Sequence, residues 1–154
     1  MDPHRAFMDM PLGFRFGVMF FIGGAVPNPL DIRFQKVSGL SATVETTALK
    51  EGGQNLYAQK LPTGISYDNL VLERGLVVGS ALNVEINATL SLFKFAPSNV
   101  LVTLFNESFV PLSAWMFFKA YPVKWSTSDL DATQKAVLID RIELAYARMQ
   151  IMRI

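Results

Sequence analysis

The sequence predicts a mainly β domain, an antiparallel sandwich or barrel with at most one substantial helix. Three observations lead to this fold class. Apolar and polar residues alternate in short runs, which is the two-residue period of a half-buried strand. Turn signals made of glycine and proline separate these runs at regular spacing. The runs add up to roughly seven to nine strands, with neither an internal repeat nor a low-complexity tract.

Length and composition set the limits of this prediction. A chain of 154 residues is long enough to bury one core, so we expect an N-terminal arm over residues 1–12 and a single domain over 13–154. The hydrophobic fraction of 51% is high, and the charged fraction of 18% lies below the usual value of about 25%. Such an excess of apolar residues is typical of subunit interfaces. The absence of cysteine excludes a disulfide framework and a thiolate metal site.

Charge and hydropathy argue against several classes of protein. Lys and Arg number 14 against 13 for Asp and Glu, and no basic stripe for nucleic acid or an anionic membrane is visible. The longest apolar run, residues 16–22, is far shorter than the roughly 20 residues that span a bilayer. The first ten residues carry two acidic groups and lack the pattern of a secretory signal. We therefore expect no signal peptide and no stable membrane insertion.

The first half of the chain gives four strand predictions. Residues 14–22 alternate with period two and become apolar on both faces, and a loop rich in glycine and proline follows at 23–29. Within the stretch 31–77, alternation around Ile32 and Phe34, over 42–46, and around Leu70 and Leu72 indicates three half-buried strands.

Residues 80–92 fit two structures. Apolar residues at 82, 84, 86, 88, 90 and 92 alternate as in a strand. Leu82, Ile86 and Leu90 also fall at helical spacing, with Ser80 as a possible N-cap. The pattern alone leaves both structures open.

The second half gives three further strands. Val100, Val102 and Leu104 alternate with their neighbours, and a run over 112–120 continues that pattern. In the second run we expect a shared face made of Trp115, Phe117, Lys119 and Tyr121, with Pro122 at a bend or a sheet edge. A last strand is predicted over residues 136–149.

The residues that carry enzyme chemistry are scarce. His4 is the single histidine and lies in the predicted arm, which argues against a Ser-His-acid triad. A pair of the 13 carboxylates could form a hydrolase site, and Trp115, Phe117 and Tyr121 could line a small-ligand-binding barrel. Surface carboxylates and core aromatics are the simpler interpretations. We predict no catalytic residue, no cofactor and no metal.

Six segments of the chain together resemble one family. They read DIRFQKVSGLSATVET, KEGGQNLYAQKLP, YDNLVLERGLVVGS, PSNVLVTLFNE, AYPVKWSTSDLDA and IDRIELAYARM. In order and spacing they are similar to the tail tube proteins of contractile-tailed phages, a family that also supplies inner tube proteins to phage-tail-like contractile injection systems. The resemblance runs from about residue 14 to residue 149.

The resemblance implies an architecture and a set of partners. It implies a β-barrel or sandwich flanked by one helix, here residues 80–92, that assembles into hexameric rings with one pooled barrel. The rings stack inside a sheath, and their bore delivers DNA or protein cargo. Implied partners are further copies of the chain, a sheath protein, baseplate or hub proteins and tube-terminating proteins. The implied location is a virion tail or phage-tail-like particle, assembled in the bacterial cytoplasm, and the implied role is structural rather than enzymatic.

The resemblance also implies where rings contact each other. Without it, the stretch around Gly52 and Gly53 is a plain hairpin tip. With it, a hairpin over residues 45–56 extends onto the next ring. The implied stacking residues are Glu45, Lys50, Glu51, Gly52, Gly53, Gln54, Asn55 and Leu56. One departure from the family pattern is Thr63, which separates Pro62 from Gly64 where the family commonly has glycine directly after the proline.

A second role within the same particle stays open. The head of the chain, residues 7–21, is rich in Phe and Met. This composition is compatible with a specialised ring next to the baseplate or at the end of the tube.

Overall fold

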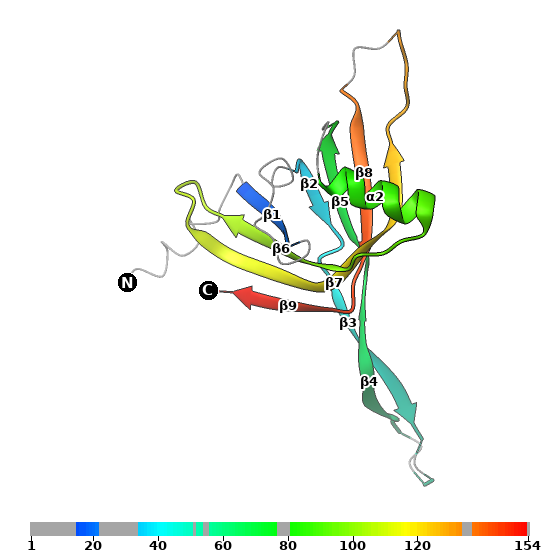
Figure 1. The fold of residues 1–154 in the computed structure, drawn as a ribbon. Coiled ribbons are helices and arrows are strands. Elements are labelled where there is room, and N and C mark those ends of the chain that lie inside the picture. The colour runs from blue at the N-terminus through cyan, green and yellow to red at the C-terminus, as the bar shows by residue number, and fades with distance from the viewer. Residues whose placement is uncertain are drawn as a thin grey trace.

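The computed structural model describes residues 15–21, 34–50, 52–53, 56–76, 81–133 and 137–153. Within these ranges the chain forms nine strands and one helix (Figure 1). They are β1 (Arg15–Phe21), β2 (Lys36–Ser38), β3 (Ala42–Leu49), β4 (Gln59–Tyr67), β5 (Leu70–Gly75), α2 (Ala81–Leu92), β6 (Ser98–Phe105), β7 (Pro111–Thr127), β8 (Ile139–Ala145) and β9 (Arg148–Arg153). The mainly β prediction is confirmed. The predicted arm, His4 and the loop at 23–29 lie outside the described residues.

Two antiparallel sheets share the long strand β7. Sheet A has the order β1-β6-β7-β9, and sheet B has the order β7-β8-β5-β2. Residues 113–118 of β7 pair with β9, whereas residues 121–127 pair with β8. Strands β3 and β4 pair only with each other, as a separate antiparallel hairpin. The chain thus builds a two-sheet body, from which the β3–β4 hairpin projects (Figure 1).

Strand β7 changes sheets at a local distortion. Lys119 has a positive φ of 56°, which non-glycine residues rarely adopt, and the register of β7 shifts again between Pro122 and Lys124. An extra residue reverses the faces of all side chains beyond it. Phe117 and Ala120 are therefore both buried, while Lys119 is exposed. The predicted common face of Trp115, Phe117, Lys119 and Tyr121 is wrong after Phe117. Pro122 lies where β7 is the edge of sheet B, as expected.

The predicted last strand over 136–149 is also wrong, because it is two strands. β8 ends at Ala145 and β9 begins at Arg148, and both pair with β7. The N–H of Ala147 donates to the carbonyl of Phe118 at 2.9 Å, next to the distortion at Lys119. The chain turns there from sheet B into sheet A. Alternation continues through the turn, which is why the sequence pattern did not show it.

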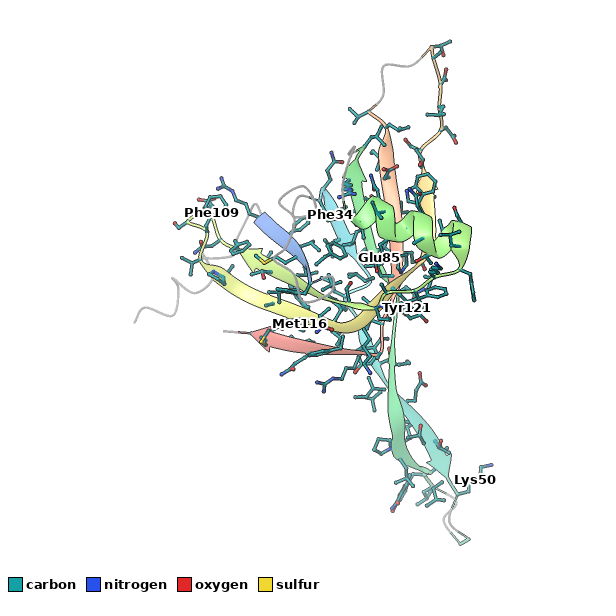
Figure 2. The ribbon with its side chains drawn as sticks, in the orientation of Figure 1. Phe34, Lys50, Glu85, Phe109, Met116 and Tyr121 are labelled. Atoms are coloured by element: carbon teal, nitrogen blue, oxygen red, sulfur yellow. The ribbon has the colours of Figure 1, made fainter. Side chains whose placement is uncertain are left out.

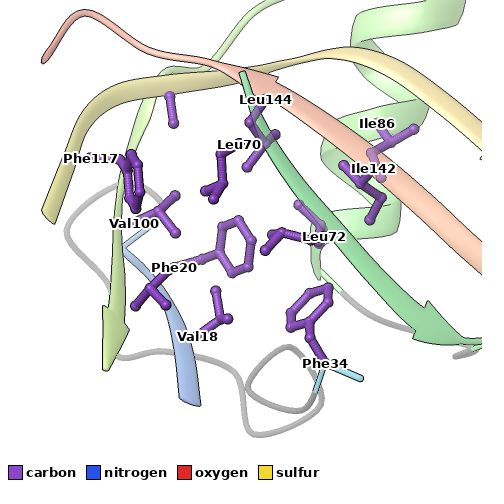
Figure 3. Packing of buried hydrophobic residues seen from close by; sticks show 13 residues of the cluster. Val18, Phe20, Phe34, Leu70, Leu72, Ile86, Val100, Phe117, Ile142 and Leu144 are labelled. Carbon is purple, nitrogen blue, oxygen red and sulfur yellow. The ribbon is translucent and has the colours of Figure 1, made fainter. Parts of the chain in front are cut away.

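The core lies between the two sheets (Figure 3). Sheet A contributes Val18, Phe20, Val100, Val102 and Phe117, and sheet B contributes Leu70, Leu72, Ile142 and Leu144. Their alternating positions confirm the predicted strands at β1, β5 and β6. Phe34 is buried too, although the strand predicted around it begins only at Lys36, and Ile32 is outside the described residues.

Helix α2 spans Ala81–Leu92, which resolves the open choice at 80–92 in favour of a helix. Its buried residues Leu82, Ile86 and Thr89 recur at helical spacing. Arg74 and Asp140, register partners on β5 and β8, are buried as well. Arg74 donates to Asn83 of the helix at 3.1 Å, and Asp140 accepts from Thr127 at 3.1 Å. In the described part of the chain, no helix is long and apolar enough to cross a membrane.

Candidate assembly surfaces

The β3–β4 hairpin projects away from the body (Figure 1). Every residue of β3 is exposed, and in β4 only Tyr67, at the base, is half-buried. The sequence predicted that one face of this segment would be buried, and within one chain this prediction is wrong. The reason is that no other described strand or helix covers either face of the hairpin. A two-stranded hairpin is marginally stable in water, so such an arm needs a partner.

Large apolar side chains mark the hairpin as a binding surface. Val44 and Ile65 are register partners and are 57% and 59% exposed. Leu56 at the tip is 94% exposed and Tyr57 is 60% exposed. Leu49 and Leu61 add to this surface. Contiguous exposed apolar surface is typical of protein interaction sites. Of these residues only Leu56 was in the predicted set, although the alternation around Val44 contained the signal for the others.

The structure places the predicted stacking residues at two levels of the hairpin. Glu45 lies within β3, where its carboxylate accepts a hydrogen bond from Ser66 at 2.6 Å. Lys50, Gly52, Gly53 and Leu56 lie at the far end, and Gly53 has a φ of +95° that favours glycine (Figure 2). Glu51, Gln54 and Asn55 are outside the described residues. The described members thus share one hairpin, with Glu45 about 17 Å of strand away from Lys50.

Thr63 forms a β-bulge in the hairpin. Glu45 pairs with Gly64 and Thr46 pairs with Pro62, so Thr63 has no register partner in β3. Its hydroxyl donates to the carbonyl of Glu45 at 3.2 Å, which stabilises the bulge. The one departure from the family pattern therefore has a local structural consequence, since bulges bend and twist a strand pair.

The base of the hairpin is tied to the body. Ser41 donates to the carboxylate of Asp68 across the hairpin. The hydroxyl of Tyr146 donates to the backbone carbonyl of Asp68 at 2.7 Å. Burial raises the pKa of Tyr146 to about 12, with further contributions from the negative charge of Asp68 and from Tyr67. At Gly39, φ is +82° and an added Cβ would lie 2.0 Å from the carbonyl oxygen of Asn69, so the two chain segments meet closely.

Sheet A has unpaired edges on both sides. β1 pairs only with β6, and β9 pairs only with β7, among the strands that the structure describes. Each edge presents backbone N–H and C=O groups that another chain can pair with. Because each neighbouring pair in the order β1-β6-β7-β9 is antiparallel, β1 and β9 also run in opposite directions. A β9 edge can therefore join the β1 edge of an identical, equally oriented chain as a further antiparallel pair.

The face of sheet A turned away from the core is rich in methionine. Met19, Leu101 and Met116 lie side by side in register, followed by Gln150 on β9. The next row includes Thr103, Ala114 and Met152. Arg148 stacks over Phe118 at 4.3 Å from the ring centroid. Among the described strand residues on this face there is no acidic side chain.

Two pockets large enough for a small molecule lie in the described part of the chain. One of about 270 Å³ is apolar and is lined by Phe16, Val37, Leu40, Val102, Leu104 and Trp115. A smaller one of about 160 Å³ lies beside α2 and Trp125. The three aromatics proposed for a small-ligand barrel do not meet in either pocket, because Phe117 is in the core and Tyr121 stacks on Phe95. Within the described ranges, no three His, Asp or Glu residues are placed to hold a metal.

Comparison with known proteins gives consistent results. The sequence model of the family described as "T4-like virus tail tube protein gp19" matches residues 12–150. No curated protein matches the chain. A chain in the cryo-EM structure of the anti-feeding prophage baseplate is 37% identical, with 92% of this chain and 95% of that chain covered and a TM-score of 0.83.

Two further structures extend the comparison. A chain in the anti-feeding prophage cap is 26% identical, with 91% and 89% covered and a TM-score of 0.75. A chain in the sheath–tube complex of an extracellular contractile injection system is 22% identical, with 100% and 99% covered and a TM-score of 0.76. The last of these shows the shared fold.

Proposed function

Since this chain belongs to the T4-like virus tail tube protein family, we propose that it is a structural subunit of the inner tube of a contractile phage tail or a contractile injection system. Rings of the chain stack inside a sheath and form a channel. The role is mechanical and needs no catalytic group. The observation that carries the proposal is the hairpin, which is exposed on both faces in the single chain and therefore requires a neighbouring subunit.

Ring formation uses the edges of sheet A. Joining β9 of one subunit to β1 of the next extends the order β1-β6-β7-β9 around a ring without changing the antiparallel pattern. A hexameric ring closed in this way has no unpaired edge left in sheet A, which removes sites of uncontrolled aggregation. The wall of the tube is then a continuous barrel of strands.

Stacking uses the β3–β4 hairpin. The predicted residues Glu45, Lys50, Glu51, Gly52, Gly53, Gln54, Asn55 and Leu56, together with the exposed Val44, Tyr57 and Ile65, reach the adjacent ring. Burial of these apolar side chains against a neighbour stabilises the stack by about 25 cal/mol for each Å² removed from water.

The bore is lined by the methionine-rich face of sheet A. The opposite face of this sheet packs on sheet B, so only the face with Met19, Met116 and Met152 is available to a channel. Cargo, either DNA or protein, passes along this wall. An outer partner such as a sheath protein contacts helix α2, where Val84 and Leu92 are exposed.

The test is assembly of the purified chain. We expect rings and short tubes in negative-stain images, and loss of tubes but not of folding when Leu56 and Tyr57 are both replaced by Asp. In a matched control, Asp replaces Leu130, an exposed residue outside the hairpin and outside the edges of sheet A. This variant should still form tubes. A wild-type chain that stays monomeric at high concentration, without rings, would contradict the proposal.

A second candidate is a specialised ring next to the baseplate. The chains from the anti-feeding prophage baseplate and cap are 37% and 26% identical to this chain, so the baseplate chain and the cap chain differ from each other in sequence. The more similar chain comes from the baseplate structure and the less similar one from the cap. This difference favours a baseplate-proximal ring over a terminal ring. Counting copies in intact particles separates the two candidates, since a single ring supports the specialised role and many rings support the main tube.

The place of assembly stays a prediction. Membership of the family supports a component of a tail or tail-like particle. Assembly in the cytoplasm of the producing cell follows from the resemblance alone. The test is to separate the cytoplasm of intact producing cells from their membranes and medium and to detect the chain in each fraction with an antibody.

A further inference from the structure

The direction of the hairpin depends on its base. Among the described strands and the helix, none packs along the length of the hairpin, so the segments 39–41 and 68–69 at its base orient it relative to the body. The contact between Ser41 and Asp68 joins the two hairpin strands to each other. Two described side-chain hydrogen bonds join the base to the body instead. They are Tyr146 to the carbonyl of Asp68 at 2.7 Å and Asn69 to Glu143 at 3.0 Å.

These two hydrogen bonds differ in how firmly they are supported. Asn69 and Asp68 are both exposed, so water competes for both bonds, and what distinguishes them is the packing behind the donor side chain. Tyr146 is half-buried, and its ring packs edge-on against Phe117 at 4.8 Å between centroids. Phe117 is fully buried in the core. Tyr146 also contacts Tyr67, the last residue of β4, at 5.5 Å between ring centroids. The body therefore fixes the ring, and the ring fixes the hydroxyl.

We propose that Tyr146 is the positioning residue that holds the β3–β4 hairpin at the angle required for ring stacking. This inference rests on the proposed function. Tyr146 is two residues before Arg148, the first residue of the β9 edge. The backbone of Ala147, between them, is bonded to Phe118 at 2.9 Å. One short turn thus orients the edge that closes the ring and the arm that reaches the next ring.

A distance measurement tests the anchor without assembly. The chain has no cysteine, so Thr47→Cys on the hairpin and Lys124→Cys on the body can carry spin labels at defined sites. In the monomer at low concentration we expect a narrow distribution of label distances. Tyr146→Phe keeps the ring and removes the hydroxyl. We expect it to lower the ratio of aligned to misaligned hairpins about fivefold, the effect of losing one ordinary hydrogen bond.

Two controls separate positioning from a general effect on packing. Tyr67→Phe removes a hydroxyl from the neighbouring ring and should leave the distribution narrow. Replacing Tyr146 by 4-aminophenylalanine restores a donor at the same place and should restore the narrow distribution. A narrow distribution in Tyr146→Phe, or equal broadening in Tyr67→Phe, would overturn the inference.

The assembly readout is the length of tubes. In Tyr146→Phe we expect rings of normal diameter and tubes several-fold shorter, because misdirected hairpins slow stacking and not ring closure. Tubes of wild-type length would count against the anchor. Absence of rings in the wild-type chain would instead contradict the proposed function, while the distance measurement would still decide whether Tyr146 orients the hairpin.

Discussion

Strands β5 and β3 have the same alternating pattern in the sequence and opposite environments in the structure. In β5, Leu70 and Leu72 are fully buried between the two sheets. In β3, Ala42 and Val44 are exposed, and so are the polar residues between them. The difference lies in the neighbours, because β5 lies between β8 and β2, whereas β3 has only β4. Alternation therefore predicts that a face will be covered, and it does not say whether the cover comes from the same chain.

Body and hairpin should differ most in how much unfolding free energy is lost when a large apolar side chain is truncated to alanine. Leu72→Ala removes a fully buried side chain and should lower the free energy of unfolding by about 2–5 kcal/mol. Leu61→Ala in the exposed hairpin should change it by less than about 0.5 kcal/mol in the monomer. Urea denaturation followed by tryptophan fluorescence measures both. Equal losses would show that the hairpin packs on the body in solution.

A pair of glycines sharpens the comparison. Both have positive φ, +82° at Gly39 and +95° at Gly53. At Gly39 an added Cβ meets the backbone of Asn69, so Gly39→Ala should cost at least about 2 kcal/mol. At Gly53 nothing lies within 4 Å, and Gly53→Ala should cost only the conformational penalty of about 1 kcal/mol. Thermal unfolding of the two variants compares them, and a harmless Gly39→Ala would exclude the close approach at the hairpin base.

Alkaline pH tests the junction between the two regions. Burial raises the pKa of Tyr146 to about 12 from its ordinary value of 10.0. The folded state therefore holds this proton more tightly than the unfolded state does. The stabilisation is complete below pH 10 and is lost as the pH rises towards 12. Wild-type unfolding free energy should fall more steeply over this range than that of Tyr146→Phe. Parallel curves would mean that the hydroxyl of Tyr146 is solvated.

The smallest effect is expected where Val44 pairs with Ile65. Replacing both by Thr keeps the β-branched shape and removes exposed apolar surface. The monomer should lose less than about 0.5 kcal/mol of stability, while tube formation should need a higher protein concentration. Sedimentation at several concentrations measures the shift. An unchanged concentration threshold would remove this pair from the stacking surface.

Sequence reasoning recovered the elements whose pattern is local. The alternation at Val18 and Phe20, at Leu70 and Leu72, and at Val100 and Val102 placed core strands correctly. The helix at 81–92 fitted the pattern, but the resemblance to a family was needed to choose it over a strand. Alternation at 82–92 arises because both helix faces carry apolar residues, with Val84 and Leu92 exposed.

Features that depend on distant parts of the chain were missed. The turn at Tyr146 and Ala147 is set by hydrogen bonding to Phe118 and not by a glycine or proline. The face reversal at Lys119 arises from a positive φ at a residue type that gives no such signal. For the candidate site, the hairpin and its tip were placed by resemblance. Its anchor on Asp68 was not foreseen, because it joins residues 78 positions apart.

Strand β7 runs through both sheets as one strand of 17 residues, with a local distortion at Lys119. Because it pairs with β6 and β9 at one end and with β8 at the other, its covalent backbone bridges sheet A and sheet B. A load applied to sheet B therefore reaches sheet A through a covalent backbone and not through side-chain contacts alone.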